Sequence, residues 1–453
     1  MQGEQEVLFS LGAVFKVESV EFDSHLELWK IVLVTTDDGS RHVREYLQLM
    51  KQEMQEQSPT ILFGRLLLIE MGQVDKAEKY YEMLLNSLPE KHEDMASIYN
   101  SIGNVNDRKR EFNLALEYYN KAYEMRLCSL GPNHPYIGAS LSNIGNIYRH
   151  KGDYDQALKT YYQALIIDEK NHNDEHLDIA ITLRNIGLAH QGKKEFAKAL
   201  EYLKRALQMF QRLLPNEHPH IAITLGFIGE VYRDQFDYDH ALEYLHQALE
   251  MEEKMLSSNH QYLTEHIEWI AETYKMKGEN ERALAFCQEK LVNKKEKLGE
   301  NHPAIAQVLQ TMGTLLRTSD SVKAIEYYIQ ALGILEMNSP PAYLAIAKCL
   351  SNISIVYQQQ EKFDEALSFQ QRALVIKQKI HSSFHINIAV SLRSIGLIYY
   401  NINNYSKALE YLTGALKIYE ANYIPQHEDI EKIQNDIVKV KKRMNFAFKN
   451  DCQ

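Results

Sequence analysis

The sequence predicts an all-α fold, a right-handed solenoid of helix-turn-helix repeats preceded by a short β segment. An alanine recurs in similar segments at steps of 38, 41 or 42 residues, and a small residue twelve (once eleven) positions upstream keeps the same period. Each block also holds two amphipathic stretches, and neither can bury its apolar stripe without a neighbouring block. The alanines are Ala77, Ala115, Ala157, Ala199, Ala241, Ala283, Ala324, Ala366 and Ala408, and the small residues are Gly103, Gly145, Gly187, Gly229, Ala271, Gly313, Ser354 and Gly396.

Composition and charge limit the class of protein. The chain has 453 residues, a formal net charge of −11 and a pI near 5.9. An acidic chain argues against nucleic acid or an anionic membrane as the main partner, because binding phosphates requires a basic face. The four cysteines are scattered without a CxxC pair, which is typical of reduced thiols. We therefore expect a cytoplasmic protein with no nucleic-acid partner, no membrane partner and no metal site. Its oligomeric state stays open.

Residues 1–50 differ in pattern from the rest of the chain. Polar and apolar residues alternate between Val14 and Val20, and the run LWKIVLVTT follows. Such alternation predicts two or three strands joined by a turn. A sheet of so few strands is only marginally stable alone, so we treat 1–50 as a β-rich unit separate from the repeats.

The segment EQEVLF at 4–9, followed by VFKV at 14–17, resembles the carboxyl-terminal end of arginine-specific mono-ADP-ribosyltransferase domains of the R-S-E class. The resemblance implies that Glu6 is the catalytic carboxylate that assists NAD cleavage, and that Glu4 orients the acceptor guanidine. The family also needs an Arg strand and a Ser-Thr-Ser strand upstream to hold NAD, whereas this chain begins at Met1 without them. We expect an inactive remnant with no cofactor in this chain, and NAD only if the complete transferase domain exists upstream. An unrelated strand with solvated glutamates is the alternative.

Residues 59–425 contain about nine repeats, and the third repeat shows their pattern. Its first stretch, YIGASLSNIGNIYRHKG, places Ile137 and Ile144 on one apolar helical face. The KGD that follows ends this helix, with Gly152 suited to a positive φ. A second amphipathic helix, YDQALKTYYQALIIDEK, comes next. Small residues such as Gly145 are expected where the two helices cross closely.

Three regions depart from this pattern. The first repeat, 59–88, is less regular, as terminal repeats often are. The inter-helix turn RTSDS of the seventh repeat is one residue short and lacks a glycine, which predicts a local irregularity near 317–322. After the ninth repeat, HEDIEKIQNDIVKVKKRM predicts a capping helix at 427–446.

The repeats resemble tetratricopeptide repeats, and their 42-residue spacing with LGxxHP linkers resembles the kinesin light chain subtype. The linkers Leu130–Pro135 and Leu298–Pro303 carry this likeness, and Leu214–Pro219 is a partial copy. The heptad coiled coil that precedes the repeats of kinesin light chains is absent, so the resemblance implies the repeat subtype and not motor attachment. It implies a scaffold that binds a protein or peptide.

Histidines and tyrosines recur with the same period. Metal ligands must approach one shared ion to about 2 Å, whereas successive linkers are separated by two helix layers, ~20 Å in all. We therefore expect the histidines to serve linker packing or helix capping, and the tyrosines to serve the core rather than phosphorylation. The histidines are His92, His134, His176, His218, His260, His302, His385 and His427, and the tyrosine pairs are Tyr80–Tyr81, Tyr118–Tyr119, Tyr161–Tyr162 and Tyr327–Tyr328.

The first helix of each repeat is expected to line a concave groove. Positions −3, −2, +1 and +4 from the small residue should face it. Amides there can bridge the main chain of an extended peptide, and arginines can bind carboxylates with two hydrogen bonds. The alternative is a solvated groove with incidental charges. These positions include Asn100, Asn104, Ser142, Asn143, Asn146, Arg149, Arg184, Asn185, Glu230, Arg233, Glu268, Trp269, Lys275, Arg317, Asn352 and Arg393.

Two functions follow from these features. The first is a protein-interaction scaffold that binds an extended, acidic peptide in the groove. The alternative is an NAD-dependent arginine mono-ADP-ribosyltransferase with a repeat targeting module, present here as a fragment that lacks most of its NAD site. The repeats contain no Walker loop, HExxH, GxSxG or kinase signature, which favours the scaffold. The identity of the bound partner is not predicted.

Overall fold

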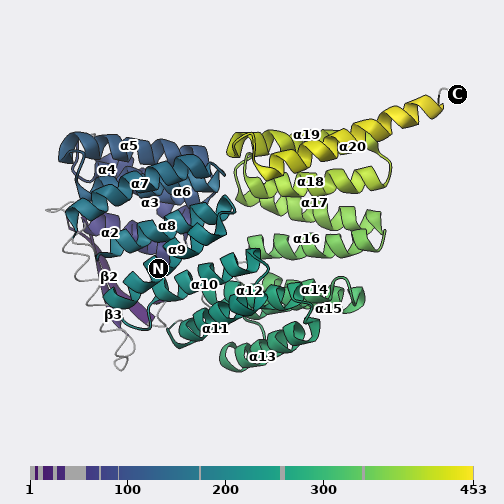
Figure 1. Cartoon of the computed structure of the whole chain (residues 1–453), viewed down its shortest axis with the longest axis horizontal. Helices are drawn as coiled ribbons and strands as arrows, with labels where there is room; N and C mark the ends of the chain where they lie inside the picture. Colours follow the sequence, from purple (N-terminus) through teal and green to yellow (C-terminus); the bar gives the residue numbers. More distant parts are fainter. Residues whose placement is uncertain are drawn as a thin grey trace.

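The structure, a computed structural model, describes residues 6–8, 14–23, 28–35, 58–70, 73–89, 91–172, 175–255, 261–338 and 342–451. Within these residues, nine pairs of helices follow one another and a single helix ends the array (Figure 1). The predicted all-α solenoid of helix pairs is therefore confirmed. The last helix, α20 (Glu428–Asp451), runs beyond the predicted end at residue 446.

Each pair corresponds to one sequence repeat, here called units one to nine. The π-helix η1 (Leu66–Glu70) extends the first helix of unit one, so this terminal unit is the irregular one, as predicted. The pairs are α2 (Pro59–Arg65) with α3 (Val74–Ser87), α4 (Met95–Arg108) with α5 (Phe112–Leu130), α6 (Pro135–His150) with α7 (Tyr154–Asn171), α8 (Leu177–Gly192) with α9 (Phe196–Leu213), α10 (Pro219–Asp234) with α11 (Tyr238–Met255), α12 (Gln261–Met276) with α13 (Asn280–Leu298), α14 (Pro303–Leu316) with α15 (Ser321–Met337), α16 (Tyr343–Gln359) with α17 (Phe363–Ile380), and α18 (Ile386–Asn401) with α19 (Tyr405–Asn422).

Three strands precede the helices in the described part of the chain. They are β1 (Glu6–Leu8), β2 (Val14–Asp23) and β3 (Leu28–Thr35). They form one antiparallel sheet in the order β1-β2-β3. The register between β2 and β3 shifts between Val17 and Ser19, as it does where a β-bulge inserts one extra residue into a strand.

Within a unit, the two helices cross at the periodic alanine and the small residue. All nine alanines are fully buried. At Gly145, an added Cβ would lie 2.6 Å from the ring of Tyr161, and at Gly187 it would lie 2.8 Å from Leu203. A glycine is needed at these crossings because the facing side chain occupies the space of a Cβ. The tyrosine four residues after the alanine is buried where it occurs, at Tyr81, Tyr119, Tyr161 and Tyr328, which confirms the predicted core role for these members of the pairs.

Between its two helices, a unit turns through one residue with positive φ. Gly152 has φ 80°, as predicted, and Gly278 has φ 87°. Five other units place a non-glycine residue there, for which the left-handed conformation is costly. In unit seven, Arg317 keeps helical angles with φ −51°, because this turn is one residue shorter. The non-glycine residues are Arg110, Lys194, Phe236, Glu361 and Asn403.

The array curves far enough for its two ends to meet. In Figure 1, the α5–α7 region lies beside the start of α19 and α20. One buried hydrophobic cluster contains Phe112 and Ile147 together with Leu412 and Tyr419. The structure is therefore a nearly closed ring of units. Among the described residues, no helix combines the length and apolarity needed to cross a bilayer.

Candidate functional site

The first helices lie on the inner side of the ring. Neighbouring first helices contact one another from α6 through to α16. The ion pair between Lys348 and Glu268 (3.1 Å) joins α16 to α12, two units away. The predicted peptide-contacting residues all lie on first helices or, for Arg317, at the end of one. This set, called the inner face below, comprises Asn100, Asn104, Asn143, Asn146, Arg149, Arg184, Asn185, Arg233, Lys275, Arg317, Asn352 and Arg393.

Several asparagines of the inner face already have protein partners. Tyr161 donates a hydrogen bond from its hydroxyl to Asn146 Oδ1 at 2.6 Å, and Tyr119 bonds Asn104 in the same way. Asn143 Nδ2 donates to Asn100 Oδ1 of the preceding unit at 2.9 Å. These bonds use one oxygen lone pair or one N–H each, so each amide keeps further hydrogen-bonding capacity for a ligand.

One asparagine does not face the groove as predicted. Asn185 occupies the same repeat position as Asn143 and Asn352 but is only 8% exposed, whereas the other two are half-buried. α8 contacts both α6 and α10, so it has a neighbouring first helix on each side. Asn185 therefore belongs to the packing between first helices.

Two basic side chains of the inner face, Arg233 and Arg393, are paired with acids. Arg233 Nη2 lies 3.3 Å from Glu230 Oε1, and Nη1 lies 3.7 Å from Glu272. Burial raises the pKa of Glu230 to about 7, against the opposing effect of Arg233. Arg393 bonds Asp436 of α20 through both Nε (2.8 Å) and Nη2 (2.7 Å). The charges of these residues are thus largely compensated inside the protein.

Two arginines of the inner face have no carboxylate within ion-pair distance among the described residues. They are Arg149 and Arg317, and the Nε of each is buried without a hydrogen-bond partner. Arg149 contacts His150, with Nη2 2.9 Å from the ring Nε2. Lys275 lies near Arg317, which together with burial lowers the pKa of Lys275, and it donates to the carbonyl of Thr314 at 3.0 Å. Arg184 differs, since it lies over the ring of Phe210.

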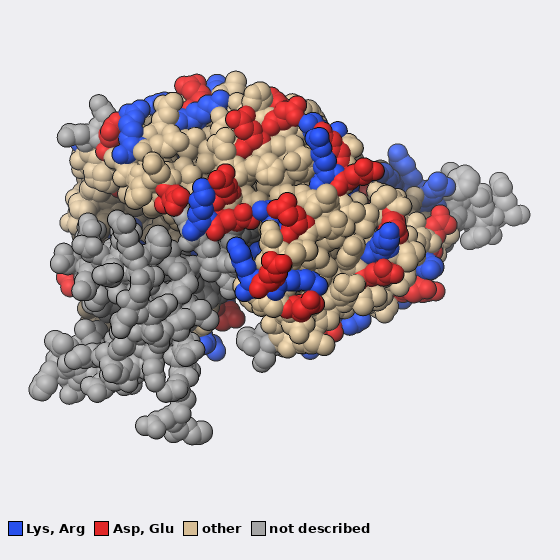
Figure 2. Space-filling view, turned by 90° about the horizontal axis from the view of Figure 1, so that it is seen from below, with Lys and Arg blue, Asp and Glu red and all other residues tan. Residues whose placement is uncertain are grey.

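The sequence pattern placed Glu230 and Glu268 at groove positions without predicting their ion pairs, and it missed Asp436. Glu272 stands one residue after Ala271, a position that the predicted pattern includes, and its repeat position therefore signalled it. Asp436 lies in the capping helix, outside the repeat period, so no periodic signal marked it. Figure 2 shows acidic and basic side chains interspersed on the described part of the face seen from below.

The linker histidines cap helices, as predicted. In seven linkers within the described residues, the ring Nδ1 accepts a hydrogen bond from the backbone N–H two residues later, at 3.0 to 3.2 Å. Except at His92, whose donor Asp94 precedes α4, this satisfies one of the free N–H groups at a helix start. The residues are His92, His134, His176, His218, His302, His385 and His427, while His260 lies outside the described residues.

One linker brings three potential metal ligands together. His172, His176 and Asp178 have ligand atoms within 4.8 Å of one another. The two imidazole rings are stacked, with centroids 3.5 Å apart and planes 5° from parallel. Nitrogen lone pairs lie in the ring plane, so two parallel stacked rings cannot both aim at one ion. His176 Nδ1 is also occupied by the N–H of Asp178, and the cluster is therefore explained as a capping joint.

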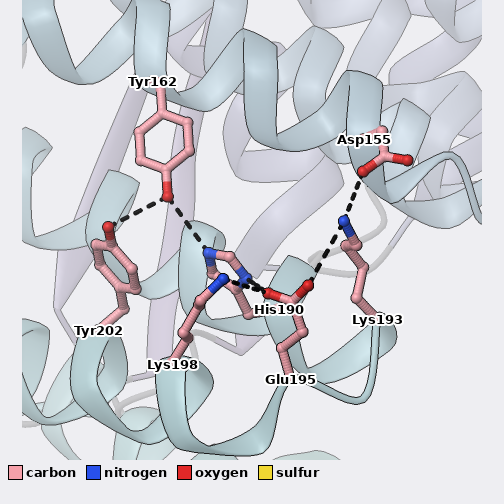
Figure 3. Close-up of polar contacts among 7 residues, drawn as sticks. All are labelled: Asp155, Tyr162, His190, Lys193, Glu195, Lys198 and Tyr202. Carbon is pink, nitrogen blue, oxygen red and sulfur yellow. Dashed lines mark hydrogen bonds and ion pairs between the residues drawn. The ribbon is translucent and has the colours of Figure 1, made fainter.

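A hydrogen-bonded network joins α7, α8 and α9 (Figure 3). Tyr162 lies 3.3 Å from His190 Nε2 and 3.1 Å from the hydroxyl of Tyr202, and His190 Nδ1 lies 2.9 Å from Glu195. Such a chain resembles a proton relay. However, burial raises the pKa of Tyr162 well above its usual value, whereas an activated nucleophile requires a lowered pKa.

The same network restrains the α8–α9 turn. Hydrogen bonds from Lys198 and His190 lower the pKa of Glu195 to about 2. Lys193, next to this turn, donates to Asp155 of α7 at 2.7 Å. We attribute a structural role to these residues because every charged member has a partner of opposite charge.

The two glutamates of the transferase-like segment remain outside this description. Glu4 and the side chain of Glu6 lie outside the described residues. The predictions made for them stay predictions.

Several solved structures are similar to parts of this chain. The TPR-like repeats of a Podosopora anserina protein of the kinesin light chain type are 20% identical, with 44% of this chain and 96% of that chain covered and a TM-score of 0.40. BtubC (BKLC) from P. vanneervenii is 20% identical, covering 50% and 89% with a TM-score of 0.40. A Rap protein complexed with competence and sporulation factor is 18% identical, covering 73% and 91% with a TM-score of 0.47.

Sequence comparison gives the family. No curated protein matches the chain. One tetratricopeptide-repeat profile matches residues 136–212, 178–254 and 345–421, and a second matches residues 95–136. Because these segments together span more than half of the 453 residues, the chain belongs to the tetratricopeptide-repeat family.

Proposed function

We propose that this protein is an interaction scaffold whose inner face binds an extended peptide with acidic side chains. The observation that carries the proposal is the pair of arginines, Arg149 and Arg317, whose buried Nε atoms lack a hydrogen-bond partner. A buried N–H without a partner costs about 1 to 3 kcal/mol, and reorientation of the guanidinium onto a ligand carboxylate would remove that cost. The other arginines with resolved contacts on this face already bind acids or an aromatic ring.

The supporting chemistry is that of the guanidinium group. It binds a carboxylate through two parallel hydrogen bonds. Lys275 stands beside Arg317 without a carboxylate at ion-pair distance among the described residues, so a second cation is available there. The free capacity of Asn143 and Asn146 suits the main chain of an extended ligand.

Fluorescence anisotropy with defined peptides tests this proposal. The probes are short labelled peptides rich in Asp and Glu, and matched peptides with Asn and Gln in their place. We expect the acidic peptides to bind more tightly, and the combined change Arg149→Glu and Arg317→Glu to weaken them about tenfold or more. The control is Arg205→Glu with Arg372→Glu, two arginines on the second helices α9 and α17. Equal binding of the acidic and neutral peptides would refute the proposal.

A further inference from the structure

The two ends of the ring touch through specific hydrogen bonds. Asn113, at the start of α5, donates from Nδ2 to the carbonyl of Ala421 at 2.8 Å. The backbone N–H of Ile424 donates to the carbonyl of Lys151 at 3.2 Å. Lys151 also donates to Asn113 Oδ1 at 2.6 Å. Units two and three are thus bonded to the end of α19 and to the segment that follows it, where Figure 1 shows the two parts side by side.

A linker histidine packs into the same contact. The ring of His427 lies against Gly152 so closely that a Cβ on this glycine would be 2.6 Å from His427 Cδ2. The ring also stacks on Tyr423, with centroids 3.7 Å apart. We call the contacts of Asn113, Lys151 and Gly152 with the 421–427 segment the second closure.

His385, in the linker before α18, makes another contact between the two ends of the ring, which we call the first closure. It is only 3% exposed, it caps α18 through Nδ1, and it stacks on His381 at 3.5 Å. It also hydrogen-bonds the backbone of Lys109, in the turn between α4 and α5. Because Nδ1 accepts from Asn387, the proton must sit on Nε2, and this N–H donates to the Lys109 carbonyl. His385 therefore connects unit two to unit nine.

We propose that the ring opens and closes, and that the neutral form of His385 holds it closed. Protonation of His385 removes its acceptor and places a cation in a buried contact. This inference does not depend on the proposed peptide ligand, because it concerns the ring by itself. It predicts an open form in which both closures separate while the helix pairs stay folded.

The charges around the first closure explain its sensitivity to acid. His385 faces His381 on its own linker, Lys377 of α17, and Lys109 and Arg110 of the α4–α5 turn. Burial, then His381 and Arg110, lower its pKa to about 3, against the hydrogen bond to the Lys109 backbone, which raises it. His381 faces the same cations, with Asp75 of α3 as the carboxylate that opposes them. A protonated His385 is therefore repelled by Arg110 in the turn of unit two.

The second closure is less sensitive to acid. Burial lowers the pKa of His427, but Asp429 and Glu428 of α20 oppose that shift more than Lys432 supports it. A lowered pKa in the closed form means that closure is fully favoured above the ordinary histidine pKa near 6.5 and is lost as the pH falls below it. For His385 alone, the ratio of closed to open form changes about tenfold per pH unit between about pH 6.5 and pH 3.

The Ile424 amide reports closure directly. Its hydrogen bond to Lys151 crosses the contact, so its exchange with solvent, corrected for the intrinsic rate, measures opening. In the full chain without ligand, we expect protection to fall about tenfold per pH unit below about pH 6.5. Amides inside α8 and α9 should stay protected, and the radius of gyration from X-ray scattering should rise.

Matched variants separate closure from capping. His385→Asn keeps an N-cap residue but cannot reach Lys109 or become charged, so we expect an open ring at every pH. His302→Asn makes the same exchange at a cap of α14 that lies away from both closures, and it should keep the pH response. Asn113→Ala changes an exposed side chain and should weaken protection of Ile424 near pH 7.5. The proposal fails if Ile424 stays protected at about pH 5 in the natural chain, or if His302→Asn opens the ring as His385→Asn does.

Discussion

The crossing of α6 and α7 makes a quantitative prediction about Gly145. Its α-carbon faces the fully buried ring of Tyr161, and an added Cβ would lie 2.6 Å from Cε1 and 2.7 Å from Cδ1. Such contacts are shorter than real Cβ contacts, and the ring is held by its hydroxyl bond to Asn146 at 2.6 Å. In Gly145→Ala, the ring must therefore move, and the hydroxyl bond must lengthen or break.

Three terms give the magnitude. Overpacking a core costs about 1 to 3 kcal/mol, and losing a buried hydrogen bond costs about 1 kcal/mol more. Alanine in place of glycine inside a helix returns about 1 kcal/mol. We therefore expect Gly145→Ala to reduce the free energy of unfolding by about 1 to 3 kcal/mol. Gly333→Ala in α15 is the matched control, because no atom lies within 4 Å of the added Cβ, and it should stabilise by about 0.5 to 1 kcal/mol.

The chain itself contains a compensated version of this crossing. Unit six has Ala271 in place of the glycine and Cys287 in place of the tyrosine, and both are fully buried in one cluster. Adding Tyr161→Cys to Gly145→Ala should therefore relieve the clash, so that the double variant is more stable than the sum of the two single changes predicts. Urea unfolding followed by circular dichroism, with hydrogen exchange in α6 and α7, measures both effects. A Gly145→Ala variant as stable as the natural chain would refute the reasoning.

Three further predictions follow from single residues. Phe236 is 73% exposed with φ 63°, a left-handed conformation that glycine adopts at lower cost. Phe236→Gly should therefore raise the free energy of unfolding by about 0.5 to 1 kcal/mol. Asp168 is buried, accepts a hydrogen bond from Thr182 at 3.0 Å, and has a pKa raised by burial to about 6. The pKa of Asp168 is higher in the folded than in the unfolded chain, so the free energy of unfolding should fall by about 2 to 3 kcal/mol as the pH rises from about 4 to about 6. Asp168→Asn should abolish this pH dependence. The exposed control Glu169→Gln should keep it. Urea unfolding at each pH measures both effects. For the transferase-like segment, we expect no Glu6-dependent labelling with etheno-NAD, and transfer lost in Glu6→Gln would overturn this expectation.

The repeat period predicted several features that lie within a unit. The alanine and the small residue mark the helix crossing, the KGD turn marks the positive φ at Gly152, and the linker histidine marks the cap. These features are local, because each depends on residues a few positions apart on one helix or across one turn. A sequence pattern with the right spacing is therefore enough to place them, and Gly145 with Tyr161 is an example.

The repeat pattern did not predict the side-chain contacts between units. Lys348 reaches Glu268 across two units, and Arg393 binds Asp436 outside the repeats, because the curvature of the array brings their helices together. Curvature is the sum of small rotations at every interface between units, and no single repeat encodes it. The predicted groove positions therefore included Glu230 and Glu268, but the ion pairs that these acids form, and the partner Asp436, were not predicted.

The linker histidines show how one residue type acquires two roles from this curvature. A cap through Nδ1 requires a neutral ring with its proton on Nε2, so each capping histidine also carries an N–H donor on its far side. Serine or asparagine caps a helix as well, but neither side chain carries a second polar atom so far from the cap. At His302 the ring only caps its own helix start, whereas His385 reaches the carbonyl of Lys109 because the array has returned to its beginning. The chemistry that joins each unit to the next is thus the chemistry that closes the ring, and the position along the superhelix decides which histidine serves both purposes.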